Sequence, residues 1–201
     1  MINKNENKKQ TALSAELILF TLCSLLFFSH GCAGPPKHKH YIRQDFAISS
    51  VKRVAILPLE NYTSDNYAGE RIRKTIITEI LSRGIDVIEP GEVTKTLTDL
   101  KVNSLGALSV KEAQDLQKTL GVEAVIMGAV DAYGISAGIS VSYPEVSIQL
   151  MLLDASSGSI VWSVWHTSGG ASFWARHFGV EGMSLSEAAK KVVKETVDTL
   201  F

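Results

Sequence analysis

The apolar positions in the first half of this chain follow a strand period and a helix period in turn. Residues 53–59 form a short, continuous apolar run that is long enough for a buried strand. Ile72, Ile76 and Ile80 then recur at the spacing of one helix face, and Gly84 follows where a left-handed residue would end the helix. The pattern predicts strands over residues 53–59 and 85–88 and helices over residues 67–83, 92–100 and 109–121, the last opened by a capping box of Ser109 and Glu112.

In the second half of the chain the strand period dominates. Residues 123–133 are apolar on both faces, which predicts a central strand. Val146, Ile148 and Leu150 alternate with their neighbours, as in a half-buried strand. The pattern predicts strands over residues 123–133, 146–152 and 160–165, a hairpin turn at residues 154–158, and a last helix that begins at a capping box of Ser184 and Glu187 and runs to the terminus.

The order of these elements, β-α-β-α-α-β-β-β-α, predicts the fold class. The early strands are joined through helices, so we expect them to be parallel with right-handed crossovers. The last three strands follow one another directly and should form a meander. We therefore predict an α/β fold with a mixed β-sheet and helices packed on it. Residues 51–201 should form a single domain, because no second linker interrupts the apolar density.

The N-terminal residues predict export rather than a fold element. Lysines at positions 4, 8 and 9 precede an apolar run over residues 17–28. Its 12 residues are too few for a helix that crosses a bilayer, which needs about 20. Gly31 and Cys32 follow as in the lipobox of bacterial lipoproteins, although the two residues before Gly31 depart from the usual pattern. We predict a signal peptide over residues 1–31 and lipidation of Cys32; the alternative is an ordinary export signal with a coincidental cysteine.

Residues 32–50 are predicted to form a flexible tether. Two successive prolines favour extended backbone, and no hydrophobic periodicity appears before Phe46. His38 and His40 form an H-x-H pair, but no further ligands are nearby, so a solvated basic tether is favoured over a metal site. Cys32 would be the only cysteine of the mature chain, and several acyl chains on it would attach the protein stably to a membrane.

The charge balance argues against a nucleic-acid partner. The chain has 20 basic and 21 acidic residues, and removal of the leader would change its formal net charge from −1 to −2. A nucleic-acid binder should present a strongly basic face. We therefore expect no nucleic-acid partner.

One hydrolase-like pattern occurs in the chain. Residues 134–138 match G-x-S-x-G, and Asp154 and His166 follow in α/β-hydrolase order. The motif needs a turn from a strand into a helix to project its serine, and no helix pattern follows Ser136. His166 and His177 have no partners at metal-ligand spacing. We reject the hydrolase reading and expect no catalytic residue, no metal and no cofactor.

Three aromatic residues suggest a place where another protein binds. Phe173, Trp174 and Phe178 lie in a glycine-bounded segment and not on a periodic element. Exposed aromatic side chains contribute strongly to protein interfaces, so we predict a partner surface here. The alternative is that these side chains fold back and cover the edge of the sheet.

Several of these stretches resemble one family. Residues 54–61 (VAILPLEN) are similar to the "VAVLPFEN" strand and loop of the CsgG/LpoB-like periplasmic lipoproteins. Residues 84–89 resemble their second strand, residues 120–128 their "LGVDAVIVG" strand, and residues 154–162 their hairpin. The similarity covers the whole predicted domain, and the short length most resembles the neisserial antigen-type lipoproteins. These motifs are structural and contain no catalytic residues.

The resemblance implies a non-enzymatic, lipid-anchored protein that binds or scaffolds other envelope proteins. Ala33 after the cysteine resembles the outer-membrane default of enterobacteria, which implies a periplasm-facing outer-membrane lipoprotein of a Gram-negative bacterium. The alternative is a subunit of an oligomeric CsgG-like secretion pore, because residues 135–143 alternate as a membrane hairpin strand would. We expect Pro144 to interrupt this pairing, which favours an ordinary edge strand; a homo-oligomer stays open.

Overall fold

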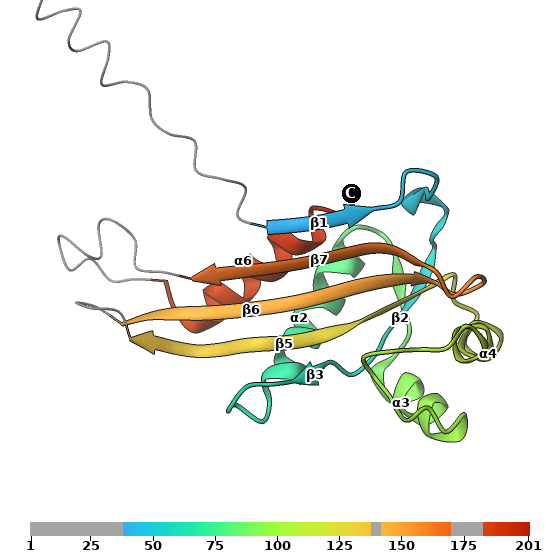
Figure 1. Ribbon diagram of the computed structural model, residues 1–201, viewed down its shortest axis with the longest axis horizontal. Coiled ribbons are helices and arrows are strands. Elements are labelled where there is room, and N and C mark those ends of the chain that lie inside the picture. Colours follow the sequence, from blue (N-terminus) through green and yellow to red (C-terminus); the bar gives the residue numbers. More distant parts are fainter. Residues whose placement is uncertain (1–37, 138–141, 170–182) are drawn as a thin grey trace, which may run out of the picture. The chain divides into compact units, whose positions relative to one another are not determined.

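The computed structural model describes residues 38–137, 142–169 and 183–201, and these form one mixed sheet with helices on both faces (Figure 1). Within this part of the chain the sheet has seven strands in the order β1-β7-β6-β5-β2-β4, and β3 lies beside β5. The strands are β1 (His38–Ile42), β2 (Arg53–Ile56), β3 (Glu60–Asn61), β4 (Asp86–Val87), β5 (Ala124–Ala137), β6 (Ser142–Asp154) and β7 (Ile160–Gly169); the helices are η1 (Ile48–Ser50), α2 (Ala68–Ser82), α3 (Pro90–Asp99), α4 (Val110–Leu120) and α6 (Leu185–Val197).

The strand directions confirm the predicted fold class. β2 pairs in parallel with both β4 and β5, as expected for strands joined through helices. β5, β6 and β7 form the predicted antiparallel meander. β5 is central, with β6 on one side and β2 and β3 on the other.

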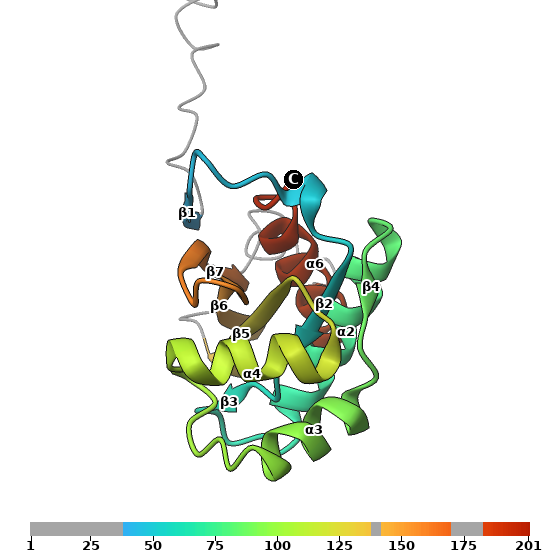
Figure 2. The same ribbon diagram turned by 90° about the vertical axis from the view of Figure 1, so that its right-hand side faces the viewer.

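The helices form two unequal layers. α2 and α6 cover one face of the sheet, where Ile72 and Val192 belong to the same buried cluster as Leu150. α3 and α4 cover the other face, where Leu97 and Leu116 are part of a second, smaller cluster. Figure 2 shows this second layer beside the beginning of β5, and Figure 1 shows that the later part of β5 extends past it.

Local sequence signals place two of the helices accurately. Ser109 accepts a hydrogen bond from the backbone N–H of Glu112, and the Glu112 carboxylate accepts one in return from the Ser109 N–H. The same reciprocal capping box, between Ser184 and Glu187, opens α6. Gly121 ends α4 with a φ of 66°, a left-handed conformation that glycine adopts without strain.

The tether predicted over residues 32–50 has to be shortened. β1 lies within that range and pairs antiparallel with β7 along its whole length, from His38 beside His166 to Ile42 beside Trp162. An edge strand that is covered only in part does not need an apolar period, which is why the sequence pattern missed it. Residues 38–42 therefore belong to the sheet and not to a tether.

The predicted break at Pro144 is absent. β5 and β6 stay in register through the pairs Ile135–Pro144 and Ala137–Ser142. The described partners of β5 on its other side, β2 and β3, reach no further than Val130, so residues 135–137 lie at an edge of the sheet as expected. In the part of the chain that the structure describes, β7 ends opposite Glu145, so Pro144 there has a paired neighbour on one side only. Such a position tolerates the missing N–H of proline.

Two glycines of β5 give a matched test of the β5–β6 packing. A Cβ built at Gly128 would stand 2.0 Å from the carbonyl oxygen of Gln149 on β6, whereas one at Gly134 would meet nothing within 4 Å. We expect Gly128→Ala to lower the free energy of unfolding by about 1–3 kcal/mol or more, because the β6 backbone must move. Gly134→Ala should change it by less than about 1 kcal/mol. Urea unfolding measures both, and equal effects of the two substitutions would contradict the tight contact.

Candidate interaction surface

The sheet has a face that the described helices leave uncovered, made by β1, β7 and the middle of β6. Along β7 the side chains of Trp162, Val164 and His166 are buried toward α6, and the alternate positions point the other way. On this other side Trp165 is 59% exposed, and Tyr41 of β1 is 54% exposed. Residues paired across the strands share a face, so this surface, which we call the open face, comprises Lys39, Tyr41, Ser147, Gln149, Ser163, Trp165 and Thr167.

Hydrogen bonds hold the aromatic side chain at the centre of the open face. The Trp165 Nε1–H donates to Ser147 Oγ at 3.1 Å. The same hydroxyl lies 2.9 Å from Thr167 Oγ1. The indole is therefore fixed on the sheet while more than half of it stays accessible. A rigid aromatic ring with a satisfied polar edge is well suited to anchor a protein contact.

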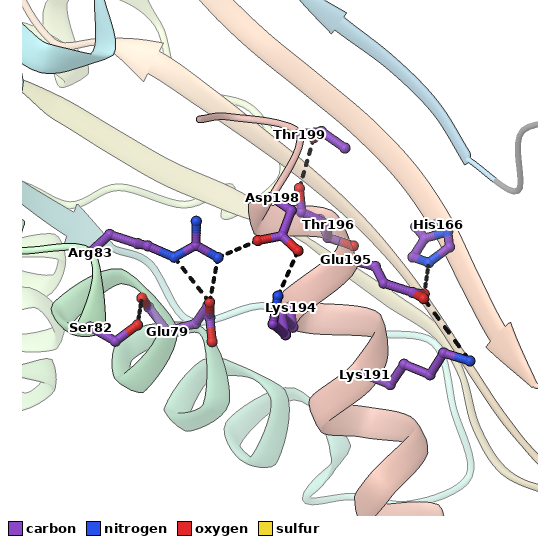
Figure 3. A network of polar contacts seen from close by, with 10 residues as sticks. All are labelled: Glu79, Ser82, Arg83, His166, Lys191, Lys194, Glu195, Thr196, Asp198 and Thr199. Carbon is purple, nitrogen blue, oxygen red and sulfur yellow. Dashed lines mark hydrogen bonds and ion pairs between the residues drawn. The ribbon is translucent and has the colours of Figure 1, made fainter.

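The opposite side of the molecule has a polar network instead of an aromatic surface (Figure 3). Arg83, just after α2, donates to Glu79 at 2.8 Å and also to Asp198 at the end of α6. Lys194 Nζ lies 2.8 Å from the second oxygen of Asp198. The guanidinium also stands 5.2 Å from the ring centre of Phe201. These contacts join the C-terminal ends of α2 and α6.

A second polar network joins α6 to the sheet. His166 is 2% exposed, and its Nε2 lies 2.7 Å from Glu195 Oε2. Lys191 Nζ stands 4.0 Å from the other oxygen of Glu195 (Figure 3). The sequence reasoning found no partner for His166 because Glu195 is 29 residues away. One sequence signal could have indicated this pair. Glu195 follows the buried Val192 by three residues, so it lies beside the apolar side of α6 that faces the sheet.

The three residues of the hydrolase-like pattern do not meet. Asp154 pairs with Ala124, twelve residues before Ser136 on β5, which corresponds to about 40 Å at the rise of a strand. Ser136 instead donates to Glu145, and His166 pairs with Glu195. This geometry excludes a triad of Ser136, Asp154 and His166.

The described residues contain no cluster of three or more His, Cys, Asp or Glu side chains that could hold a metal ion. Among the helices described, none is both long and apolar enough to cross a membrane. Cys32, the predicted lipidation site, lies outside the described residues. The predicted partner residues Phe173, Trp174 and Phe178 also lie outside them.

Comparison with protein families identifies the domain. Residues 41–201 match the family described as "Putative lipoprotein GNA1162-like". This match confirms the predicted relation to the neisserial antigen-type lipoproteins. No curated protein matches the chain.

Two solved structures share the fold. The PelC dodecamer from Paraburkholderia phytofirmans is 22% identical, with a TM-score of 0.58 over 81% of this chain and 95% of PelC. Lipoprotein GNA1162 from Neisseria meningitidis is 19% identical, with a TM-score of 0.51 over 74% of this chain and 96% of GNA1162. At these identities the likeness shows a common fold alone.

The contacts of Asp198 predict a pH-dependent contribution to stability. The Lys194 ammonium and the Arg83 guanidinium hold the pKa of the Asp198 carboxyl below its ordinary value. A depressed folded-state pKa stabilises the protein above the unfolded pKa of about 3.9, and this contribution disappears as the pH falls through the folded value. Asp198 is 43% exposed, so we expect Asp198→Asn to cost less than about 1 kcal/mol at pH 7.

Urea unfolding of this variant at pH 7 and at pH 3 checks the prediction, and the difference from the natural protein should shrink at the lower pH. Asp99→Asn is the control, because Asp99 is exposed and has no ion pair among the described residues. A loss from Asp198→Asn that is the same at both pH values would contradict the ion-pair origin.

Proposed function

Because the chain belongs to the GNA1162-like lipoprotein family, we propose that it is a lipid-anchored, non-catalytic protein of the bacterial envelope that binds or scaffolds other envelope proteins. The family match over residues 41–201 is the observation on which this proposal rests. The leader and the Gly31–Cys32 pair in front of the matched region agree with it. The separation of Ser136, Asp154 and His166 removes the one catalytic pattern in the sequence.

Cys32 is the proposed site of lipid attachment. Two or more acyl chains there would hold the protein on a membrane, whereas one chain binds only marginally. Ala33 in the next position supports the outer membrane of a Gram-negative bacterium, with the domain facing the periplasm.

Two surfaces are candidates for the protein contact. The open face around Trp165 and Tyr41 presents aromatic side chains on rigid strands. Phe173, Trp174 and Phe178 remain a predicted partner surface on the strength of their sequence context. Rigid aromatic groups lose little conformational entropy on binding, which favours the open face as an anchor.

A second candidate function is a subunit of an oligomeric secretion pore or ring. The observation that favours it is the fold shared with PelC, which was solved as a dodecamer. The long pairing of β5 with β6 also favours an oligomer, since these strands continue past the layer of α3 and α4. In this case the open face would contact another copy of the same chain.

The proposed lipid anchor predicts that substitution of Cys32 moves the protein from the membrane fraction to the soluble fraction. Cys32→Ser should abolish acylation and release the protein from membranes into the soluble envelope fraction, because the thiol at the predicted cleavage point that would accept the acyl group is removed. Incorporation of a labelled fatty acid and membrane flotation measure the two effects. Continued flotation of the variant would mean that the leader has been misread.

Site-specific photo-crosslinking distinguishes the surfaces and the partners. A photoreactive amino acid in place of Trp165 should form adducts in intact cells, and one in place of Leu81, which is 50% exposed on α2, should form few. Adducts with another envelope protein would support the scaffold, and adducts with a second copy would support the ring. The same replacement at Trp174 tests the other surface. Equal yields at positions 165 and 81 would contradict a contact on the open face.

A further inference from the structure

The last part of β5 has a partner strand on one side only in the part of the chain that the structure describes. On its outer side β3 pairs with β5 as far as Val130, and the N–H of Tyr62 donates to the Val130 carbonyl as the chain leaves the sheet. β5 itself continues to Ala137. Figure 1 shows this end of β5, with its arrowhead on the left, as the outermost strand there. We call the outer side of residues 131–137 the β5 edge.

The pairing with β6 shows which backbone groups point to the β5 edge. In an antiparallel pair, residues whose N–H and C=O point to the partner strand alternate with residues whose groups point away from it. Pro144 stands opposite Ile135, and a proline fits within a paired strand where its missing N–H would point away from the partner. The N–H and C=O of Ile135 therefore point to the β5 edge, and by alternation so do those of Tyr133 and Ala137.

The side chains of the β5 edge do not protect it against pairing with another strand. Natural edge strands are commonly protected by charged residues or prolines. Residues 132–137 contain neither, and Asp131 is the single charged residue of the segment. Ile135 is 63% exposed at the edge. An added extended strand would therefore find uncharged side chains and outward-pointing backbone groups.

The β5 edge is complementary to a second copy of itself. When two copies pair antiparallel about Gly134, Tyr133 of each copy stands opposite Ile135 of the other. Both residues present their N–H and C=O to the edge, so they can form hydrogen-bonded pairs. A cross-strand pair of an aromatic and a β-branched side chain is also favourable.

The same register agrees with the packing and charge of the edge. Tyr133 packs against the core cluster on the α2–α6 side, so the exposed Ile135 of one copy would gain an anchored aromatic neighbour in the other. Gly134 would stand opposite itself, and a Cβ built there meets nothing within 4 Å. The two Asp131 residues would lie at opposite ends of the paired segment, so their charges would not face each other.

We propose that the β5 edge pairs with the same edge of a second copy, antiparallel about Gly134, and joins the two sheets into one. Such a self-complementary contact closes with two copies. Its two-fold axis is perpendicular to the sheet, so the open faces of both copies lie on the same side and one partner can contact two Trp165 side chains. The pairing does not depend on the proposed lipid anchor. The two edges are short compared with a standard interface, so the dimer is weak and covalent trapping is the suitable measurement.

A cysteine at position 134 tests the pairing, because this position would stand opposite itself. Cα atoms in such a pair are about 4.5 Å apart, within the range that a disulfide spans. Intact cells that express the whole chain with Gly134→Cys are treated with copper–phenanthroline, and covalent dimer is quantified by non-reducing electrophoresis. We expect several-fold more dimer than from the unsubstituted chain, in which Cys23 and Cys32 report any dimer formed through natural cysteines.

Ser136→Cys is the matched control for the register. Position 136 would stand opposite position 132 of the other copy, so the two cysteines would lie four residue steps apart, about 13 Å along the strands and too far for a disulfide. Lys95→Cys, exposed on α3, reports random collisions. Both should give only the dimer of the unsubstituted chain. Equal dimer at positions 134 and 136, or no dimer at position 134, overturns the proposal, and a disulfide adduct of position 134 with a different protein overturns the second copy as the partner.

A proline at position 135 separates pairing from folding. Because the N–H of Ile135 points to the β5 edge, Ile135→Pro in the Gly134→Cys chain removes a donor to the second copy without removing one to β6. The dimer should fall to the level of the unsubstituted chain, while thermal unfolding shows that the domain still folds. Unchanged dimer in a folded proline variant overturns the proposal. If the proline variant does not fold, the comparison of positions 134 and 136 still decides.

Discussion

The structure depends on how strand β5 is covered. From Ala124 to Val130 every side chain of β5 is buried, since β5 lies between the α2–α6 layer and the α3–α4 layer. At Asp131 the burial ends, and the register with β6 shifts between Val130 and Ala132. The bulge places an exposed carboxylate at the point where the second helix layer stops. Beyond it β5 continues with one face toward solvent, and Ala132 there pairs with Ser147 of the open face.

The two faces of the outer strands then have different roles. Toward α6 they supply buried side chains, with Trp162 anchored by a hydrogen bond from its Nε1 to Thr199 and His166 paired with Glu195. On the open face the polar side chains of β6 and β7 bond to one another and hold Trp165. An antiparallel sheet can present one face to solvent in this way, whereas the parallel β2–β4 region is covered. The candidate contact surface therefore lies on the antiparallel half of the fold.

Much of this fold follows from short-range sequence signals. The capping boxes at Ser109 and Ser184 and the isoleucine spacing of α2 identify their helices because each signal lies within one or two turns. β1 and the His166–Glu195 pair depend on residues far apart in the chain, so no local period indicates them. Of the candidate surfaces, the sequence indicated Trp174 by its irregular context. It gave no sign that Trp165 points outward, because an alternating strand does not show which face a helix covers.

The pairing of β1 with β7 also has a mechanical consequence. The tether enters the sheet at His38, and the hydrogen bonds between antiparallel strands run across the strand axis. A pull along β1 from the proposed lipid anchor at Cys32 would therefore load these bonds together, in shear, rather than open them one after another. Tension between the membrane and a bound partner would pass from β1 through β7 to the centre of the sheet. An edge strand with a polar sequence can thus act as the force-bearing link of the whole molecule.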